Sequence, residues 1–361
     1  MPPAIPAPAA SLHERMTPLH GGTLRIGVVG TGTIGELHAR IFAGNPRCEL
    51  VAVCDADVTR ARNVAEALGC ATDPDWRGLL ARDLDAISIA TPETLRMEPA
   101  RAAAEKGMKI LLEKPLGRSL ADVDALVDVL GAAGADPAVN FILHADPRFA
   151  RMKEIVAGGG IGQIATCYAR RRGSASGAGK YAPWTDLLSA TLIHDIDMCL
   201  AVMGARVERV FAEAVVRRCA QFDCHDAVVA TLRFADGAVA CLETSWVLPP
   251  GWPEPLDPAF HLIGDGGSVV IESSSQGLRV LGAGGYVQPD MTHWPSLAWG
   301  VDGALRRSLD IFVDRALSGA PPLVGLQAAR EAEAVVAAMK QSIECGLPVA
   351  PEAPPTRRAA R

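Results

Sequence analysis

Two short stretches of the sequence carry side chains that could move protons. Glu113 and Lys114 follow the apolar run of "MKILLEKP", and His194 interrupts another apolar run, "LLSATLIHDIDMCLAVMG". A lysine amine and an imidazole can each take up or return a proton when their surroundings favour it. A histidine on an apolar helical face is, however, more often a hydrogen-bonded core residue than a base. The residues alone leave both interpretations of His194 open.

A glycine-rich turn near the start of the chain predicts where a nucleotide would lie. "GTGTIG" has the GxGxxG spacing, directly after the apolar run "LRIGVVG" and before a helical stretch. In this setting the first glycine permits a tight turn, the second lets a pyrophosphate approach the backbone, and the third lets helix and strand pack closely. We therefore expect a dinucleotide to bind along this turn. Its residues are Gly30, Thr31, Gly32, Thr33, Ile34 and Gly35.

Asp55 ends the second apolar run of the chain, 20 residues after Gly35. An acidic side chain at this point can accept hydrogen bonds from an adenosine ribose and would repel a 2′-phosphate. The sequence therefore favours NAD over NADP, although Arg60 and Arg62 lie near enough in sequence to soften that preference. The alternative is that Asp55 only caps the end of the strand.

The pattern of elements predicts two domains of different class. Short apolar strands alternate with helices over residues 23–145, as in "DAISIATP" and "MKILLEKP", which is typical of an α/β, Rossmann-type, doubly wound parallel sheet. Ligands of such sheets bind at the carboxyl ends of the strands. We therefore expect the turn formed by Ala90, Thr91 and Pro92 to line the nicotinamide side of the site.

Alternating strands dominate beyond residue 145. "DAVVATLRFADGAVACLETSW" and "FHLIGDGGSVVIES" contain hairpin turns, and they predict an α+β domain over residues 146–350 with a largely antiparallel, open sheet. Two amphipathic stretches near the end, "SLDIFVDRALSG" and "LQAAREAEAVVAAMKQSIECG", predict helices. Residues 1–22 and 351–361 are rich in Pro and Ala, and we expect both ends to be disordered.

Composition narrows the class of partner. A length of 361 residues suits two domains, and a net charge of −6 argues against a nucleic-acid partner. The first residues resemble neither a signal peptide nor a membrane anchor, and nine scattered cysteines suit a reducing cytoplasm. Cys219, Cys224 and His225 lack the paired spacing of a metal site. We expect a cytoplasmic protein that acts on a small molecule, without a metal ion or a membrane.

The order of GxGxxG, "ATPE", "EKP" and "IHDID" resembles the Gfo/Idh/MocA family, the glucose-fructose oxidoreductase and inositol dehydrogenase type, from Leu24 to about Pro348. The resemblance implies an NAD-dependent oxidoreductase that transfers hydride between nicotinamide and a secondary alcohol or ketone of a polyol, sugar or sugar derivative. It implies that Lys114 lies between nicotinamide and substrate and acts with His194 on the hydroxyl proton, while Glu113 and Lys114 also shape the cofactor site. It further implies a homodimer or homotetramer.

The chain departs from the family beside His194. Many members have an aspartate four residues before the histidine, where this sequence has Ala190. Asp186, Asp195 and Asp197 are the nearby substitutes. Asp197 lies three residues after His194 and so shares its side of a helix, whereas Asp195 points about 100° away. Asp197 is therefore the expected partner, unless it caps backbone NH groups instead.

The substrate side also differs from the family. Arg96 stands where members commonly have a histidine, and His144 where they commonly have an arginine. Arg170 and Arg172 share one face of a strand, which leads into a Gly/Ser-rich loop that we expect to form a lid. If the basic residues face the ligand, an acidic substrate is favoured; otherwise they form a charged edge that blocks strand pairing. The expected substrate-binding residues are Arg96, His144, Arg172, Tyr181, Trp184 and Asp197.

Two other functions fit the same motifs. One is an enzyme that keeps NAD bound and cleaves glycosides through a transient oxidation. The other is a non-catalytic ligand sensor that retains the nucleotide fold, an alternative that Ala190 favours and that intact Lys114 and His194 oppose.

Overall fold

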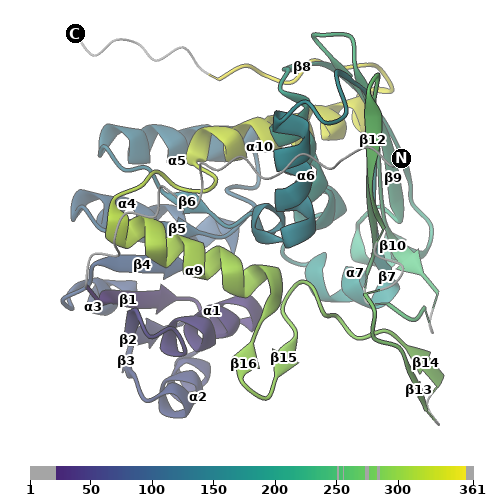
Figure 1. Cartoon of the computed structure of the whole chain (residues 1–361). Coiled ribbons are helices and arrows are strands. Elements are labelled where there is room, and N and C mark those ends of the chain that lie inside the picture. The colour runs from purple at the N-terminus through teal and green to yellow at the C-terminus, as the bar shows by residue number, and fades with distance from the viewer. Residues whose placement is uncertain (1–21, 250–251, 255, 273–275, 283–284, 355–361) are drawn as a thin grey trace, which may run out of the picture. The chain divides into compact units, whose positions relative to one another are not determined.

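The chain folds into two compact units. The computed structural model describes residues 22–249, 252–254, 256–272, 276–282 and 285–354 (Figure 1). Of these, the first unit contains residues up to 145 together with 293–329, and the second unit contains 146–292 together with 330–354. The ends that we expected to be disordered fall almost entirely outside the described residues.

The first unit is built on the predicted parallel sheet. Its strand order is β3-β2-β1-β4-β5-β6, and every pair is parallel. The central strands are buried almost throughout, as expected for a sheet covered on both faces. The strands are β1 (Leu24–Val29), β2 (Cys48–Cys54), β3 (Ala71–Asp73), β4 (Ala86–Ile89), β5 (Lys109–Leu112) and β6 (Ala138–Val139).

Helices connect these strands, and several of them begin or end at residues that are typical helix caps. Asp57 caps α2 by accepting a hydrogen bond from Arg60 N, and Gly69 ends it at a φ of 69°. Ser119 and Asp122 form a capping box at the start of α5. The helical segments up to residue 145 are α1 (Thr33–Ala43), α2 (Val58–Leu68), α3 (Trp76–Leu80), η1 (Glu93–Leu95), α4 (Met97–Glu105), α5 (Leu120–Ala132) and η2 (Ile142–Ala145).

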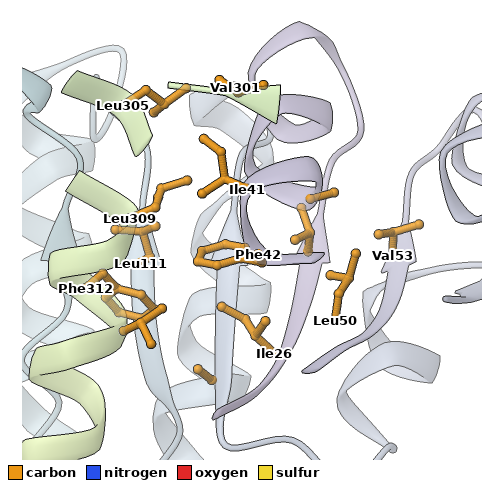
Figure 2. Close-up of a cluster of buried hydrophobic side chains, with 14 of the residues drawn as sticks. Ile26, Ile41, Phe42, Leu50, Val53, Leu111, Val301, Leu305, Leu309 and Phe312 are labelled. Atoms are coloured by element: carbon orange, nitrogen blue, oxygen red, sulfur yellow. The ribbon is translucent and has the colours of Figure 1, made fainter. Parts of the chain in front are cut away.

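The segment 293–329 corrects the predicted domain division, which assigned it to the second domain. It contains β15 (Ser296–Leu297), β16 (Gly300–Val301) and α9 (Gly303–Ser318), and it packs within the first unit. Leu305, Leu309 and Phe312 of α9 point toward Phe42 of α1 and Ile26 of β1 (Figure 2). Because this apolar stripe is buried in the core of the first unit, α9 belongs there despite its late place in the sequence.

The second unit contains a mixed, largely antiparallel sheet. Its strand order is β12-β11-β7-β10-β9-β8, and within this sheet, as far as the structure describes it, only the β7–β10 pair is parallel. The two predicted hairpins are confirmed as β9–β10 and β11–β12. The strands are β7 (Ile164–Ser174), β8 (Val207–Val215), β9 (Ala227–Phe234), β10 (Val239–Leu248), β11 (Leu256–Gly264) and β12 (Gly267–Glu272), with a separate hairpin of β13 (Val280–Gly282) and β14 (Gly285–Val287).

The helices of the second unit include one that the sequence did not predict. The Gly/Ser-rich segment that we expected to be a loop forms α7 (Ala175–Tyr181). A Cβ atom at Gly173 would lie 3.2 Å from Trp246, and one at Gly179 would lie 3.4 Å from Phe222. These glycines therefore allow neighbouring aromatic side chains to pack closely, and they do not make the segment a flexible loop. The other helices are α6 (Pro147–Ala157), the π-helix η3 (Leu188–Leu192), α8 (Ile193–Met203), the 3-10 helix η4 (Arg218–Phe222) and α10 (Leu326–Cys345), the last beginning in residues of the first unit.

Candidate active site

The glycine turn has the geometry that a bound pyrophosphate requires. Gly30 has a φ of 88°, and a Cβ atom at Gly35 would lie 1.8 Å from Gly30 O. Neither position accepts a side chain. At Gly32, by contrast, no described atom lies within 4 Å of the place of a Cβ atom. Gly32 also precedes α1 and gives it no side-chain cap, so the free amides of the helix start and the dipole are available to an anion.

Asp55 lies at the carboxyl end of β2 and is held by donors on both oxygens. Thr31 N donates to Oδ2 at 2.6 Å, and Asp57 N donates to Oδ1 at 2.8 Å. Arg60 adds bonds of 2.8 and 3.3 Å. Burial opposes the charged form, but these donors, led by Arg60, hold the pKa of Asp55 below its usual range. The carboxylate is therefore ionised and fixed beside the glycine turn.

The turn of Ala90, Thr91 and Pro92 follows β4 at the same edge of the sheet. Ala90 N donates to Val29 O at 2.8 Å, which joins this turn to the end of β1. Among the described residues the buried Thr91 hydroxyl has no hydrogen-bond partner. A bound polar group could supply that partner, so the residues present fit a nucleotide at this edge.

Arg96 lies behind this turn. Its side chain is 2% exposed, and its guanidinium donates to Thr91 O at 2.7 Å and also to Glu113 O and Pro115 O. The side chain is thus buried and turned toward backbone carbonyls, and its predicted contact with a substrate stays a prediction. Arg96 instead joins the loop after β4 to the loop after β5.

Glu113 and Lys114 follow β5, as the sequence predicted. Glu113 N donates to Ile89 O at 3.2 Å, which continues the pairing with β4, and the peptide bond between Lys114 and Pro115 is cis. The Lys114 side chain is half-buried. Lys114 therefore lies at the carboxyl edge of the sheet. Arg96 connects the loop that contains Lys114 to the turn of residues 90–92, because it binds Pro115 O and Thr91 O.

The carboxylate of Glu113 takes part in a group of buried polar side chains, here called the Glu113 network. Asn140 Nδ2 donates to Glu113 Oε1 at 2.5 Å, and His38 Nε2 lies 3.2 Å from the same oxygen. His38 Nδ1 lies 2.8 Å from Ser88 Oγ, and Ser308 Oγ donates to Asn140 Oδ1 at 2.7 Å. Glu113 was predicted to shape the cofactor site; the structure shows its carboxylate bound to protein groups. The network residues are His38, Ser88, Glu113, Asn140 and Ser308.

His194 lies in the first turn of α8, directly after the π-helix that contains Ala190. π-Helical turns are rare and are frequent at functional sites. His194 is half-buried, while its neighbours Asp195 and Asp197 are 0% and 3% exposed. Asp195 accepts bonds of 2.7 and 2.9 Å from Arg171 of β7.

The other two aspartates near His194 also have cationic neighbours. Lys153 of α6 has a pKa below its ordinary value because of burial, and the charge of Asp197 opposes that shift. Asp186 lies 2.6 Å from Lys340 Nζ of α10 and accepts bonds from Leu188 N and Ser189 N at the start of the π-helix. Contact between Asp197 and His194 stays a prediction.

The remaining predicted substrate residues lie in different settings. His144, in η2, is 8% exposed. Tyr181 and Trp184 are exposed at the end of α7, and the Tyr181 ring lies 6.3 Å from that of Trp246. Arg172 bonds Glu243 at 2.6 and 2.8 Å and Asp257 at 3.3 Å. Its strand, β7, lies inside the sheet, so the alternative of a charged edge strand is wrong.

Sequence reasoning missed several residues that hold the site. His38 is part of the helix after the glycine turn, and Asn140 follows β6, yet neither belongs to a motif used above. Their polar character inside apolar surroundings, in "GELHARIF" and "AVNFIL", is the signal that could have found them. Arg171 and Lys340 carried no such signal, because a charged residue on a strand or helix is usually solvated.

The comparisons with known proteins agree with this geometry. Residues 24–141 match the family described as oxidoreductase family, NAD-binding Rossmann fold, and residues 149–270 match the GFO/IDH/MocA C-terminal domain. Inositol 2-dehydrogenase from Rhizobium meliloti is 27% identical over 274 residues, covering 74% of this chain and 82% of that protein. Myo-inositol 2-dehydrogenase from Thermotoga maritima is 30% identical over 228 residues, covering 62% and 68%.

A solved structure shares the fold. Myo-inositol dehydrogenase from Corynebacterium glutamicum aligns with a TM-score of 0.78 and 24% identity, over 92% of this chain and 99% of that one. At this identity the likeness concerns the fold. With the two matched domains, it shows that the chain belongs to the GFO/IDH/MocA family of oxidoreductases and has an NAD-binding Rossmann domain.

Two kinds of feature are absent from the described residues. No helix there is long and apolar enough to cross a membrane. No group of three or more His, Cys, Asp or Glu side chains among them is arranged to hold a metal ion.

Proposed function

We propose that this oxidoreductase is an NAD-dependent dehydrogenase that oxidises a secondary alcohol of a polyol, sugar or sugar derivative, or reduces the corresponding ketone. The observation that carries the proposal is the placement of Lys114. The lysine follows β5 at the ligand-binding edge of the sheet, and Arg96 ties its loop to the turn at Thr91. The inositol dehydrogenases among the relatives support a polyol substrate.

The division of roles follows from the chemistry of each residue. Bound NAD would supply the acceptor of the hydride. The glycine turn and the start of α1 hold the pyrophosphate, and Asp55 accepts hydrogen bonds from the adenosine ribose. Lys114 takes the hydroxyl proton as the alcohol is oxidised, and His194 acts with it; in the reverse direction they return the proton.

The substrate contacts in this proposal come from two exposed aromatic side chains, two buried polar side chains and the partly exposed Arg172. Tyr181 and Trp184 present aromatic faces at the end of α7. His144 and Asp197 contribute polar atoms. Arg172 also belongs to this group, although its bonds to Glu243 and Asp257 mean that an acidic substrate would have to compete with two carboxylates.

We propose NAD as the preferred dinucleotide because Asp55 is ionised and fixed. The Arg60 side chain moderates this preference, since it is 47% exposed and could turn from Asp55 toward a 2′-phosphate. Arg60→Ala should therefore lower kcat/KM with NADP by about tenfold, an order expected for one charged contact, while kcat/KM with NAD changes less. Equal loss with both cofactors would contradict this role.

We further propose a homodimer or homotetramer in the cytoplasm. The sheet face that carries Arg170 and Glu243 also exposes Val229, Ile263 and Val270, at 47%, 56% and 58%, which supports pairing of this face with a second copy. Nine free thiols support a reducing compartment. Light scattering of the purified protein and imaging of a tagged chain test the two statements.

The experiment follows the absorbance of reduced nicotinamide with inositols, aldoses, sugar acids and glycosides. Lys114→Ala should lower kcat by about 10²- to 10⁴-fold, the usual contribution of a general acid or base. Lys109→Ala, at the exposed opposite end of β5, is the matched control and should keep activity. No reduction with any compound despite tight NAD binding would overturn the proposal in favour of a bound-cofactor enzyme or a sensor.

A further inference from the structure

The Glu113 network is buried and joins five separate segments of the first unit. His38 and Ser88 are 0% exposed, Asn140 is 2% and Ser308 is 8% exposed. They come from α1, β4, the segment after β6, and α9, and they converge on the residue after β5. Such a group is costly to bury unless its members satisfy one another, as they do here.

The hydrogen bonds of the network run in fixed directions. An ionised carboxylate only accepts, so His38 must carry a proton on Nε2 to bond Glu113. Asn140 turns its NH₂ group to the same oxygen and its carbonyl to the Ser308 hydroxyl. Burial opposes the charge on Glu113, but the bonds from His38 and Asn140 and the charge of Lys114 keep its pKa below the ordinary value. The Glu113 carboxylate is therefore ionised, and His38 and Asn140 fix its position.

The backbone around Lys114 is fastened from a second direction. Arg96 binds the carbonyl of Glu113 and the carbonyl of Pro115, one on each side of the lysine. The Glu113 side chain, which His38 and Asn140 bind, attaches the same peptide segment through different neighbours. Arg96, His38 and Asn140 therefore fix the position of Lys114 through the backbone and through Glu113. The contacts described above do not involve the Lys114 side chain.

We propose that His38 and Asn140 are positioning residues that hold the catalytic lysine through Glu113. The inference rests on the proposed role of Lys114 in proton transfer. His38 lies on α1, the helix whose first residues are proposed to hold the cofactor pyrophosphate, so the network ties the helix that places the cofactor to the segment that places the lysine. A displacement of about 1 Å in such a group can cost about 100-fold in rate.

A second polar bridge in the same unit provides the matched control. Asn45, just after α1, is 7% exposed and donates to Asp310 Oδ1 of α9 at 2.7 Å. Like the Asn140–Ser308 bond, this bond reaches α9, but it is only partly buried, with the Asp310 side chain 36% exposed, and it makes no contact with Glu113 in the hydrogen bonds described. Asn45 Oδ1 also accepts a bond of 2.8 Å from Arg47 N. Asn45→Ala therefore reports the stability cost of losing a buried amide that does not contact Glu113.

The test compares His38→Ala, His38→Gln and Asn45→Ala in the full-length protein. The Gln side chain keeps an N–H donor near the place of Nε2. We expect His38→Ala to lower kcat about 10- to 100-fold with less than threefold change in the Kd of NAD, and His38→Gln to recover most of kcat. Amide hydrogen exchange of the peptide covering 109–118 should quicken in His38→Ala and stay unchanged in Asn45→Ala.

The outcomes separate this inference from the proposed function. Unchanged exchange of 109–118 in His38→Ala, or an equal loss of kcat in Asn45→Ala, would overturn the positioning role. Activity retained by Lys114→Ala would instead overturn the proposed function, while the exchange measurement still decides whether His38 holds the segment. Loss of kcat in Lys114→Ala and His38→Ala with recovery in His38→Gln supports both.

Discussion

The two proposed catalytic residues each have an acidic neighbour in sequence, and the two acids are held in different ways. Glu113, before Lys114, is bound by the amide of Asn140 and the imidazole of His38. Asp195, after His194, accepts bonds from two guanidinium nitrogens of Arg171. The Asp195 side chain is 0% exposed and that of Arg171 is 4% exposed. In the first unit, side chains from two different segments bind the carboxylate, whereas in the second unit one guanidinium binds both carboxylate oxygens.

The difference matters when one partner is removed. If a donor to Glu113 is lost, another donor still binds the same oxygen. If Arg171 is lost, a full charge stays buried without its guanidinium, which costs much more than the pair itself contributes. The second arrangement should therefore be the more fragile to mutation, although its hydrogen bonds are the better formed.

Arg171→Met should have the largest effect. We expect a loss of about 3–5 kcal/mol in the free energy of unfolding, because Asp195 would remain buried and charged. Urea unfolding followed by circular dichroism measures it. The double variant Arg171→Met with Asp195→Leu should recover most of the loss, since the stranded charge is gone. A single-variant loss below about 1 kcal/mol would show that water or another cation reaches Asp195.

Glu113→Gln should have an intermediate effect that depends on pH. The pKa of Glu113 is lowered in the folded chain, so its stabilisation is present above the unfolded value, about 4.3, and is lost as pH falls through the folded value. At pH 7 the variant should lose about 1.5–3 kcal/mol, the range for hydrogen bonds to a charged group. The gap between wild type and variant should narrow below about pH 4. A constant gap across the range would contradict an ionised Glu113.

Arg172→Met should have the smallest effect. This arginine is next to Arg171 in β7 but faces the other side of the sheet, and its side chain is 32% exposed. Its partners keep other donors, because Tyr168 binds Glu243 and Arg170 binds Asp257. We expect a loss of at most about 1 kcal/mol that shrinks in high salt. A loss as large as that of Arg171→Met would remove the contrast between the two faces.

Local patterns predicted much of the fold. The GxGxxG turn, the alternation of strands and helices up to residue 145, and the hairpins β9–β10 and β11–β12 follow from short-range spacing. Gly346 follows α10 at a φ of 67°, and a glycine directly after an amphipathic stretch is typical of a helix end. These features depend on residues near one another in sequence, where propensity and periodicity act directly.

Features that depend on distant partners could not be predicted. The glycines of α7 suggested a loop because the sequence does not show that Trp246 and Phe222 lie against them. The three backbone carbonyls that Arg96 contacts were not predicted either, because a lone arginine after a strand gives no sign of them. His38 and Asn140 are 102 residues apart, so no local pattern connects them.

The place of α9 has a consequence for how the protein is made. A ribosome releases residues 24–145 long before Leu305, Leu309 and Phe312, which cover Phe42 and Ile26 in the finished core. During synthesis the apolar surface of this sheet therefore stays exposed until α9 has been made. Until then Ser308 has not been synthesised and cannot bind Asn140. A gene fragment cut after residue 145 should accordingly yield an aggregation-prone product, whereas one that rejoins 293–329 by a short linker should be soluble.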